Sequence, residues 1–432
     1  MYTIVLTHPL QRSALIRGLL FFLAGGMLSG VATAASFTAL GVLADSDTNS
    51  LARAVSRDGT WVAGTVSHIS GTTEAFRWSA AAGMQRLEGL AGQIGSRAFA
   101  ISGDGQVITG SSGTQPFVWT PANGMFDIGL LPNTQCGSAR GISADGSVVV
   151  GVTEGHCGNH NGNPFSWTQS GGMVQIPGVL RGEALGISED GSVIVGYSRD
   201  RRTGEVQAFR RGGDGVIQGL GFLEGGTDSV AEAVSTDGSV VVGFSAIGGP
   251  FRWTEADGMQ PLGFLPGFSG SEAIDVSGDG SLVVGESTVL ESQGYRSEAF
   301  IWDATNGMGS LHTILSNEFG FNLSGWSLLV ANAISHDGST IVGDGIDPEG
   351  KSRGWVVNLS PSKPTLRITR FANAVVLSWP VAFSNLTLRS GADLPANDSW
   401  ITLSDPRFVR LDQCVVTNSV STDRRFYLLQ SP

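Results

Sequence analysis

The sequence is poor in lysine and in the short motifs that mark common enzyme classes. Only two lysines occur, Lys351 and Lys363, and both lie near a change in the composition of the chain. This placement disfavours a lysine nucleophile. The motifs G-x-S-x-G and H-E-x-x-H and a glycine-rich phosphate loop are absent, which excludes the local signatures of α/β-hydrolases, zinc proteases and P-loop enzymes. No cofactor is indicated.

A hydrophobic run long enough to span a membrane as a helix, about 20 residues, is also lacking. The apolar run "GLLFFLAGGMLSGV" at residues 18–31 is shorter, follows Arg12 and Arg17, and precedes Ala32-Thr33-Ala34. This order is typical of a secretory signal peptide. We therefore expect residues 1–34 to be removed by cleavage after Ala34 and the mature protein to be secreted without a transmembrane segment. A membrane anchor is the alternative interpretation.

Positive charge is scarce as well. The formal net charge is −12, and loss of Arg12 and Arg17 would make it −14, which disfavours nucleic acid and anionic membranes as partners. Residues 362–432 carry 8 basic and 5 acidic side chains, whereas residues 35–361 carry 16 and 33. This asymmetry predicts two domains, at 35–360 and 361–432, with a boundary near "SPSKP".

What the sequence does contain is a repeat. The motif S-x-D-G occurs seven times at intervals of 41 to 58 residues, with its aspartates at Asp58, Asp104, Asp145, Asp190, Asp237, Asp279 and Asp337. Each copy reads as four short β segments; in the fifth copy these are "EAVS", "SVVVGFS", "PFRWT" and "MQPLGFL". Four strands per repeat of this length indicate a propeller blade. We therefore predict an all-β protein, a seven-bladed β-propeller followed by a small β-sandwich-like domain.

The aspartates are interpreted as residues of hairpin turns. In "SADGS", Gly146 can adopt the left-handed conformation that closes a tight turn, and Asp145 can accept backbone N–H bonds. A metal loop is the alternative, but it needs oxygen ligands at alternating positions, which the motif does not supply. A glycine follows each aspartate by six residues, and we expect it where blades approach closely.

Aromatic pairs recur in the third segment of the repeat. Five copies contain F-x-W, as at Phe165 and Trp167, while the fourth has Phe209 with Arg211 and the seventh has Trp355 with Val357. Residues two apart share one face of a strand, so the pair is expected to fill the space between blades, with a sugar-binding platform as the alternative. The seventh copy lacks a fourth segment, and we expect residues 37–43 to complete it and close the ring.

Residues 37–359 resemble the extracellular HAF-repeat proteins of bacteria, whose repeats look like "AxxxSxDGSVVVGxS...AFxWT...GMxxLGxL". The stretch "SGWSLLVANAISHDGSTIVGDG" is similar to the terminal repeat of that family. The resemblance implies export and a propeller-like fold, and it assigns no catalytic residues. Residues 364–430, with "AVVLSWPVAFSNLTLRS" and "RRFYLL", resemble a small β module at the end of large secreted bacterial proteins.

The loops after the second segment vary most in length, and variable loops on a rigid scaffold are where binding usually resides. They predict a ligand-binding face that contains His156, His160, Arg199, Arg202 and Tyr295. Cys136 and Cys157 flank one hairpin at the same end and are expected to form a disulfide, as befits an exported protein. A metal site built from His156, Cys157 and His160 is the alternative; Cys414 is left over.

These observations favour a binding or scaffold function for a secreted or envelope-associated monomer, with an unknown extracellular ligand such as a glycan or a protein. A hydrolase or lyase acting on polysaccharide is the alternative, because propeller enzymes can gather carboxylates from several blades without a local motif. A purely structural envelope component is the third possibility. Acidic or aromatic side chains clustered at one mouth of the ring would favour the enzyme, and small residues there would favour the scaffold.

Overall fold

The computed structural model describes residues 2–5, 35–158, 162–292 and 294–359, together with seven strands between residues 367 and 430. The described chain divides into two units, one spanning Ser36–Leu359 and the other combining residues 1–35 with 360–432. The larger unit contains seven four-stranded antiparallel sheets, each of which is one blade. The predicted seven-bladed β-propeller is therefore confirmed.

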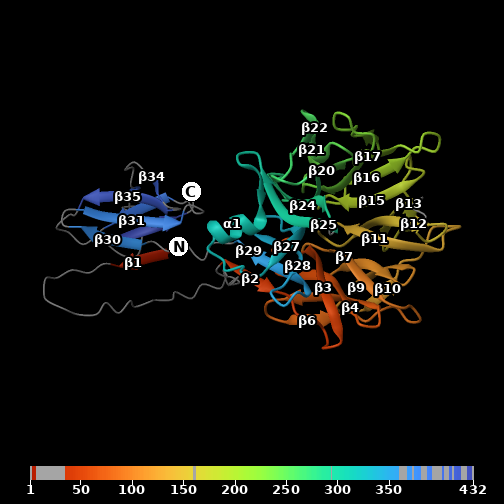
Figure 1. Cartoon of the computed structure of the whole chain (residues 1–432), viewed down its shortest axis with the longest axis horizontal. Helices are drawn as coiled ribbons and strands as arrows, with labels where there is room; N and C mark the ends of the chain where they lie inside the picture. The colour runs from red at the N-terminus through yellow and green to blue at the C-terminus, as the bar shows by residue number, and fades with distance from the viewer. Residues whose placement is uncertain are drawn as a thin grey trace. The chain divides into compact units, whose positions relative to one another are not determined.

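The first strands of the blades are neighbours of one another around a closed ring, since each contacts the first strand of the next blade and β27 contacts β3. Figure 1 shows this arrangement, with the blue strands of the last blade beside the red strands of the first. The first strands are β3 (Asp47–Val55), β7 (Ser96–Ile101), β11 (Cys136–Ile142), β15 (Gly182–Ile187), β19 (Ser229–Val234), β23 (Gly270–Val276) and β27 (Ser327–Ile334).

The remaining strands follow in antiparallel order across each blade. The second strands are β4 (Val62–His68), β8 (Ile108–Ser112), β12 (Val148–Glu154), β16 (Ile194–Arg199), β20 (Val240–Ser245), β24 (Leu282–Glu291) and β28 (Thr340–Ile346). The third strands are β5 (Thr73–Ser79), β9 (Gln115–Thr120), β13 (Asn163–Thr168), β17 (Val206–Arg211), β21 (Gly249–Thr254), β25 (Gly294–Asp303) and β29 (Ser352–Asn358). The fourth strands are β6 (Gly83–Arg86), β10 (Gly124–Asp127), β14 (Gly172–Gln175), β18 (Ile217–Gly219), β22 (Gly258–Pro261), β26 (Gly307–Ser310) and β2 (Ser36–Ala39).

The strand β2 closes the ring. It pairs with β29, so that Phe37 lies opposite Val357 and Ala39 opposite Trp355. The pairing covers only the first part of the segment 37–43 that the sequence suggested, although the Leu40 N–H still donates to the Gly354 carbonyl. Because β2 supplies the missing fourth strand of the last blade, strand β29 is not left as an open edge.

The hydrophobic core lies between neighbouring blades. The first of the two F-x-W aromatics is buried in every blade that has it, and Trp119 and Trp167 are each only 9% exposed. Phe117 and Trp119 of the second blade, for example, pack in one cluster with Ala63 and Ala75 of the first. The pairs therefore pack between blades, as predicted, although Trp78 and Trp302 are only partly buried.

The glycine that follows each motif aspartate by six residues makes a close approach inside its own blade. A Cβ atom on Gly151 would overlap the Ser138 carbonyl of the adjacent first strand and lie 3.0 Å from the Phe165 ring. The other six glycines meet their own first strand in the same way. The predicted close backbone approach is therefore present, and its partner is the first strand of the same blade, not a neighbouring blade.

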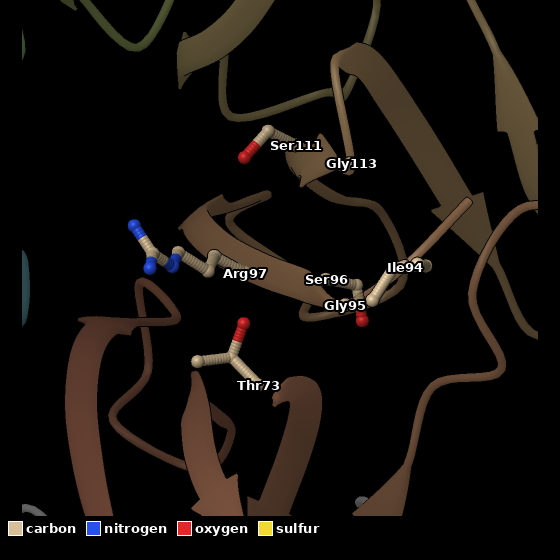
Figure 2. A pocket seen from close by; sticks show the side chains of 7 residues that line it. All are labelled: Thr73, Ile94, Gly95, Ser96, Arg97, Ser111 and Gly113. Carbon is tan, nitrogen blue, oxygen red and sulfur yellow. The ribbon is translucent and has the colours of Figure 1, made fainter. Parts of the chain in front are cut away.

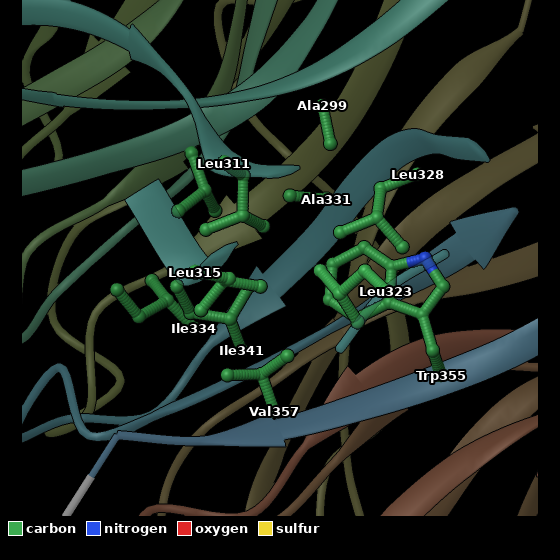
Figure 3. Close-up of a cluster of buried hydrophobic side chains, with 11 residues drawn as sticks. Ala299, Leu311, Leu315, Leu323, Leu328, Ala331, Ile334, Ile341, Trp355 and Val357 are labelled. Carbon is green, nitrogen blue, oxygen red and sulfur yellow. The ribbon is translucent and has the colours of Figure 1, made fainter. Parts of the chain in front are cut away.

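The long interval of 58 residues before the last motif contains the helix α1 (Leu311–Asn317). Its N-terminus is capped by Ser310, whose hydroxyl accepts from the Thr313 N–H at 3.2 Å. Leu311 and Leu315 are buried in a cluster with Trp355, Ile341 and other side chains of the last two blades (Figure 3). The insertion thus adds to the core between these blades.

The smaller unit contains two four-stranded antiparallel sheets. One sheet has the order β1-β36-β32-β33, formed by β1 (Tyr2–Val5), β36 (Phe426–Gln430), β32 (Thr387–Gly391) and β33 (Ile401–Thr402). The other has the order β30-β31-β35-β34, formed by β30 (Arg367–Phe371), β31 (Ala374–Pro380), β35 (Gln413–Ser419) and β34 (Phe408–Arg410). Two sheets are what a sandwich requires; their packing as a sandwich, and cleavage of the chain after Ala34, stay predictions.

Candidate functional site

The S-x-D-G segments form the turns between the first and second strands, all at one end of the propeller, which we call the turn end. In the third blade, Asp145 Oδ1 accepts from the Ser143 hydroxyl at 2.6 Å and from the Ser147 N–H at 2.9 Å. Gly146 has a φ of 73°, which suits glycine. The hydrogen bonds from Ser143 and Ser147 hold the pKa of Asp145 below its ordinary value of 3.8.

The other six turns repeat this bonding. In each, the motif serine donates to the aspartate, which also accepts from the N–H of the residue after the glycine; the aspartates are Asp58, Asp104, Asp190, Asp237, Asp279 and Asp337. All seven carboxylates are thus occupied inside their own turns. The geometry is that of a structural hairpin, as the turn interpretation requires.

The second residue of each S-x-D-G motif links the blades to one another. Backbone hydrogen bonds run around the ring, from the Arg57 N–H to the Gly103 carbonyl and onward to the His336 N–H, which donates to the Arg57 carbonyl at 3.3 Å. The structure shows six such bonds between the seven described turns. They tie the first strands together at the turn end.

Charged side chains at the same motif position meet across the propeller axis. His336 Nδ1 lies 2.7 Å from Glu189 Oε1 and 2.9 Å from the Thr236 hydroxyl, while Arg57 Nη1 lies 3.1 Å from Glu189 Oε2. These residues come from blades seven, four, five and one. The contacts between blades that are not neighbours show that this group, the axial clasp, spans the axis at the turn end.

The opposite end of the propeller, the loop end, carries the described residues of the predicted ligand-binding face. His156, Arg202 and Tyr295 are exposed, and Arg199 is half-buried and donates to the Gly204 carbonyl at 3.2 Å. His156 and Arg202 lie in loops of blades three and four, whereas Arg199 ends β16 and Tyr295 lies in β25 of blade six. Among the described residues no hydrogen bond or ion pair joins any two of them. His160 lies outside the described residues. The ligand-binding face that the sequence assigns to these residues stays a prediction.

The predicted disulfide between Cys136 and Cys157 is confirmed. The two Cα atoms are 5.8 Å apart, within the usual range for a disulfide. Because the Cys157 sulfur is bonded to Cys136, it does not supply a thiolate to a metal site with His156, and the alternative metal interpretation loses that ligand. Among the described residues, no group of three or more His, Cys, Asp or Glu side chains is placed to hold a metal ion.

Sequence reasoning missed a ring of seven residues around the axis. Each first strand contains a register shift between two small residues, as between Ala231 and Ala233 in the fifth blade, and the residue between them has no partner on the second strand. These seven axial residues are Arg53, Phe99, Arg140, Leu185, Glu232, Ile274 and Asn332. A signal was present, because in each repeat one variable residue stands between Ala and Ala, Gly or Asp, three positions before the motif serine.

The axial residues contact one another and the residues two positions before them. The Arg140 guanidinium lies 4.7 Å from the centre of the Phe99 ring, and its Nη2 lies 3.7 Å from Glu183 Oε2. On the other side of the ring, Arg53 Nη1 donates to the Asn332 side chain at 3.2 Å. The arginines near the axis, Arg53, Arg97 and Arg140, come from blades one, two and three, whereas the axial carboxylates come from blades four to seven.

Three glutamates from blades four, five and six lie within electrostatic range of each other. Burial, reinforced by the charges of Glu272 and Glu183, raises the pKa of Glu232 to about 7. Burial also raises the pKa of Glu272. Among the described residues, neither Glu232 nor Glu272 has a hydrogen-bond or ion-pair partner within the protein.

Two further carboxyls, Asp344 and Asp275, accept hydrogen bonds from neighbouring blades at the junction of blades six, seven and one. Asp344 accepts from the Ala52 N–H at 2.9 Å and from the Asn332 amide at 2.8 Å, and burial raises its pKa to about 6. Asp275 accepts from the Ile334 N–H at 2.8 Å, and burial raises its pKa to about 7. Both bridge neighbouring blades where the ring closes.

A cavity of about 220 Å³ opens at the loop end between blades one and two. Its lining is polar and includes Thr73 of β5, Ser96 and Arg97 of β7, and Ser111 of β8. Figure 2 shows the Arg97 side chain extending between Thr73 and Ser111. Arg97 occupies the same position in its strand as Glu183 and Glu272 do in theirs, two residues before the axial residue.

The comparisons with known proteins bear on the fold. No protein-family model and no curated protein matches the sequence. A solved oligogalacturonate lyase in complex with manganese is similar in structure, with a TM-score of 0.50, 13% identity and coverage of 76% of this chain and 97% of that chain. An oligogalacturonate lyase from Vibrio parahaemolyticus gives the same TM-score and coverage at 11% identity. TolB from Acinetobacter baumannii has a TM-score of 0.39 at 13% identity over 71% of this chain and 65% of its own.

Identities this low establish a shared fold and nothing about activity. No helix among the described residues is long and apolar enough to cross a membrane.

Proposed function

We propose that this chain is an exported β-propeller that binds an extracellular ligand, a glycan or a protein, at its loop end. The observation that carries the proposal is the contrast between the two ends. At the turn end the motif aspartates and the axial clasp are bonded to other groups of the protein. Towards the loop end, Arg97, Glu232 and Glu272 have no such partners among the described residues, and a polar cavity lies beside Arg97.

Propellers commonly present binding groups at one mouth of the ring, where loops from several blades converge. The resemblance to the HAF-repeat family and the signal-like leader support export. The disulfide agrees with an oxidising compartment.

A binding screen on the protein from residue 35 onward, produced in the periplasm so that the disulfide forms, tests the proposal. The screen uses a glycan array together with a panel of envelope proteins. A ligand should bind the wild type and the turn-end variant Asp145→Asn equally well. Binding should weaken in Glu272→Gln, which removes one unpaired charge near the loop end. A ligand lost in Asp145→Asn, at unchanged thermal stability, would place the site at the turn end and refute the proposal.

A second candidate is a hydrolase or lyase that acts on polysaccharide. The observation in its favour is the group Glu183, Glu232 and Glu272, which three separate blades bring together around the axis. A general acid or base works best when its pKa is near the operating pH, and burial brings Glu232 close to neutrality. Wild-type protein incubated with acidic and neutral polysaccharides should then release new reducing ends, and Glu232→Gln should not. Absence of product from the wild type across the panel would remove this candidate.

A further inference from the structure

The Arg97 side chain is the cation that lines the cavity at the loop end. It is exposed, and within the described part of the chain it takes part in no hydrogen bond or ion pair. The other two arginines near the axis are matched, Arg53 with Asp344 at 3.8 Å and Arg140 with Glu183 at 3.7 Å.

The surroundings of Arg97 are polar and uncharged. Ser111 lies directly opposite Arg97 in the β7–β8 register, and in Figure 2 its hydroxyl and that of Thr73 flank the arginine from two sides. The residues at the equivalent position of the neighbouring blades are Leu51 and Ser138, which carry no charge. The cavity is therefore lined by the Arg97 guanidinium and the Thr73 and Ser111 hydroxyls, and none of its lining residues is acidic.

A second arginine, ion-paired with Glu183, lies beside the same strand. The Arg140 guanidinium lies over the ring of Phe99, which is two residues from Arg97 on the same strand. Its Nε atom is buried and has no hydrogen-bond partner. Since the axial carboxylates lie in blades four to seven, the part of the axis beside the cavity carries arginines and no axial carboxylate.

We infer that the cavity between blades one and two binds an oxyanion group of the extracellular ligand, with Arg97 as the principal contact and Ser111 and Thr73 as hydrogen-bond donors. A guanidinium matches carboxylate, sulfate and phosphate oxygens with two parallel N–H bonds. The volume of about 220 Å³ accommodates a single charged group with part of one sugar ring. This inference rests on the proposed function and specifies which ligands the loop end selects.

Calorimetric titration of the protein from residue 35 onward tests the inference with four probes: glucuronate, glucose, inorganic phosphate and sulfate. Glucuronate and glucose differ by one carboxylate, so binding of the first without the second identifies a uronate-type ligand. Binding of phosphate or sulfate without glucuronate identifies a phosphorylated or sulfated one. Arg97→Gln should weaken the bound oxyanion about tenfold to a hundredfold, the range for a charge-assisted contact, and Arg97→Lys should weaken it less.

Arg201→Gln is the matched control, because it removes an exposed arginine of a different blade that belongs neither to the cavity nor to the predicted ligand-binding face. Its oxyanion affinity should equal that of the wild type, and the melting temperature of Arg97→Gln should also be unchanged, since Arg97 holds no other residue. The inference is wrong if glucose binds as well as glucuronate, if none of the three oxyanions binds, or if Arg97→Gln binds them normally. A ligand from the array that still binds Arg97→Gln would leave the proposed function standing and overturn this inference alone.

Discussion

The disulfide between Cys136 and Cys157 should contribute measurably to the stability of the propeller. It closes a loop with a sequence separation of 21, for which the chain-entropy relation gives about 3 kcal/mol. Unfolding entropies of about 2.1 cal/mol/K per residue imply about 0.7 kcal/mol/K for the unit Ser36–Leu359 if it unfolds cooperatively. Loss of the bond should therefore lower the melting temperature by about 4–5 °C.

Scanning calorimetry of the wild type and the double variant Cys136→Ala/Cys157→Ala, each with and without reductant, separates two effects. Reductant should shift only the wild type. The difference between the two reduced proteins then reports the loss of packing at Cys136, which is 8% exposed, whereas Cys157 is exposed and should contribute little.

Two results would refute this reasoning. Equal melting temperatures for oxidised and reduced wild type would mean that the loop is ordered without the bond and that the entropy argument does not apply. Two free thiols, detected by mass spectrometry after periplasmic production, would mean that the bond does not form in the exported protein.

Other predictions concern the turns, the axis and the closing strand. Asp145→Asn should keep the turn, because the amide oxygen can replace Oδ1 as hydrogen-bond acceptor. Gly146→Val should lower the free energy of unfolding by about 1–3 kcal/mol, because valine resists a φ of 73°. Urea titration measures the free energy of unfolding of both variants. Glu189→Gln should cost about 1–3 kcal/mol in the same assay, since it removes the charge that binds two cationic or hydrogen-bonding partners in the axial clasp. Stability should be greatest between about pH 4 and 5. The lowered pKa of turn carboxyls such as Asp145 contributes stability above about pH 4, and this contribution is lost on acidification. The raised pKa of Glu232, about 7, contributes stability below about pH 4.5, and this contribution is lost as the pH rises through 7, so Glu232→Gln should flatten the decline in stability between pH 5 and 7. Leu40→Ala, which truncates a side chain that is 1% exposed beside the closing strand, should cost about 2–5 kcal/mol, and a loss below 1 kcal/mol would show that closure by β2 is dispensable.

The architecture could be predicted because each repeat contains the same local signals for turns and strands. The Asp-Gly pair specifies a turn wherever it occurs, and the alternation around F-x-W specifies a strand with one face in the core. Ring closure could also be predicted, because the last repeat lacks a fourth β segment and an additional β segment begins at Phe37, before the first repeat. The exact length of β2 could not be predicted, because no turn motif in the sequence marks the residue at which β2 stops pairing with β29.

The axial residues could not be identified as a site in the same way. A β-bulge breaks the period of two on which face assignments depend, so the orientation of Glu232 does not follow from its place in "AEAVS". The residues that surround it, such as Arg140 and Glu272, lie 40 or more positions away in the sequence. Only the closed ring brings them together, and neither their burial nor the rise in the pKa of Glu232 has a local cause.

The two ends of the ring use the same strands for different purposes. At the turn end, small residues such as Gly103 and Gly278 at the second motif position leave room for Arg57, Glu189 and His336; a Cβ atom on Gly278 would overlap the His336 ring. The charged groups there satisfy one another and join blades that are not neighbours. Four or six residues earlier on the first strands, the charged groups are separated by blade, basic on one side of the axis and acidic on the other, and Arg97 has no partner among the described residues. Because the clasp holds the ring from one end, substitutions at the other end can change recognition with little effect on folding, which is the property that a repeat scaffold needs to acquire new ligands.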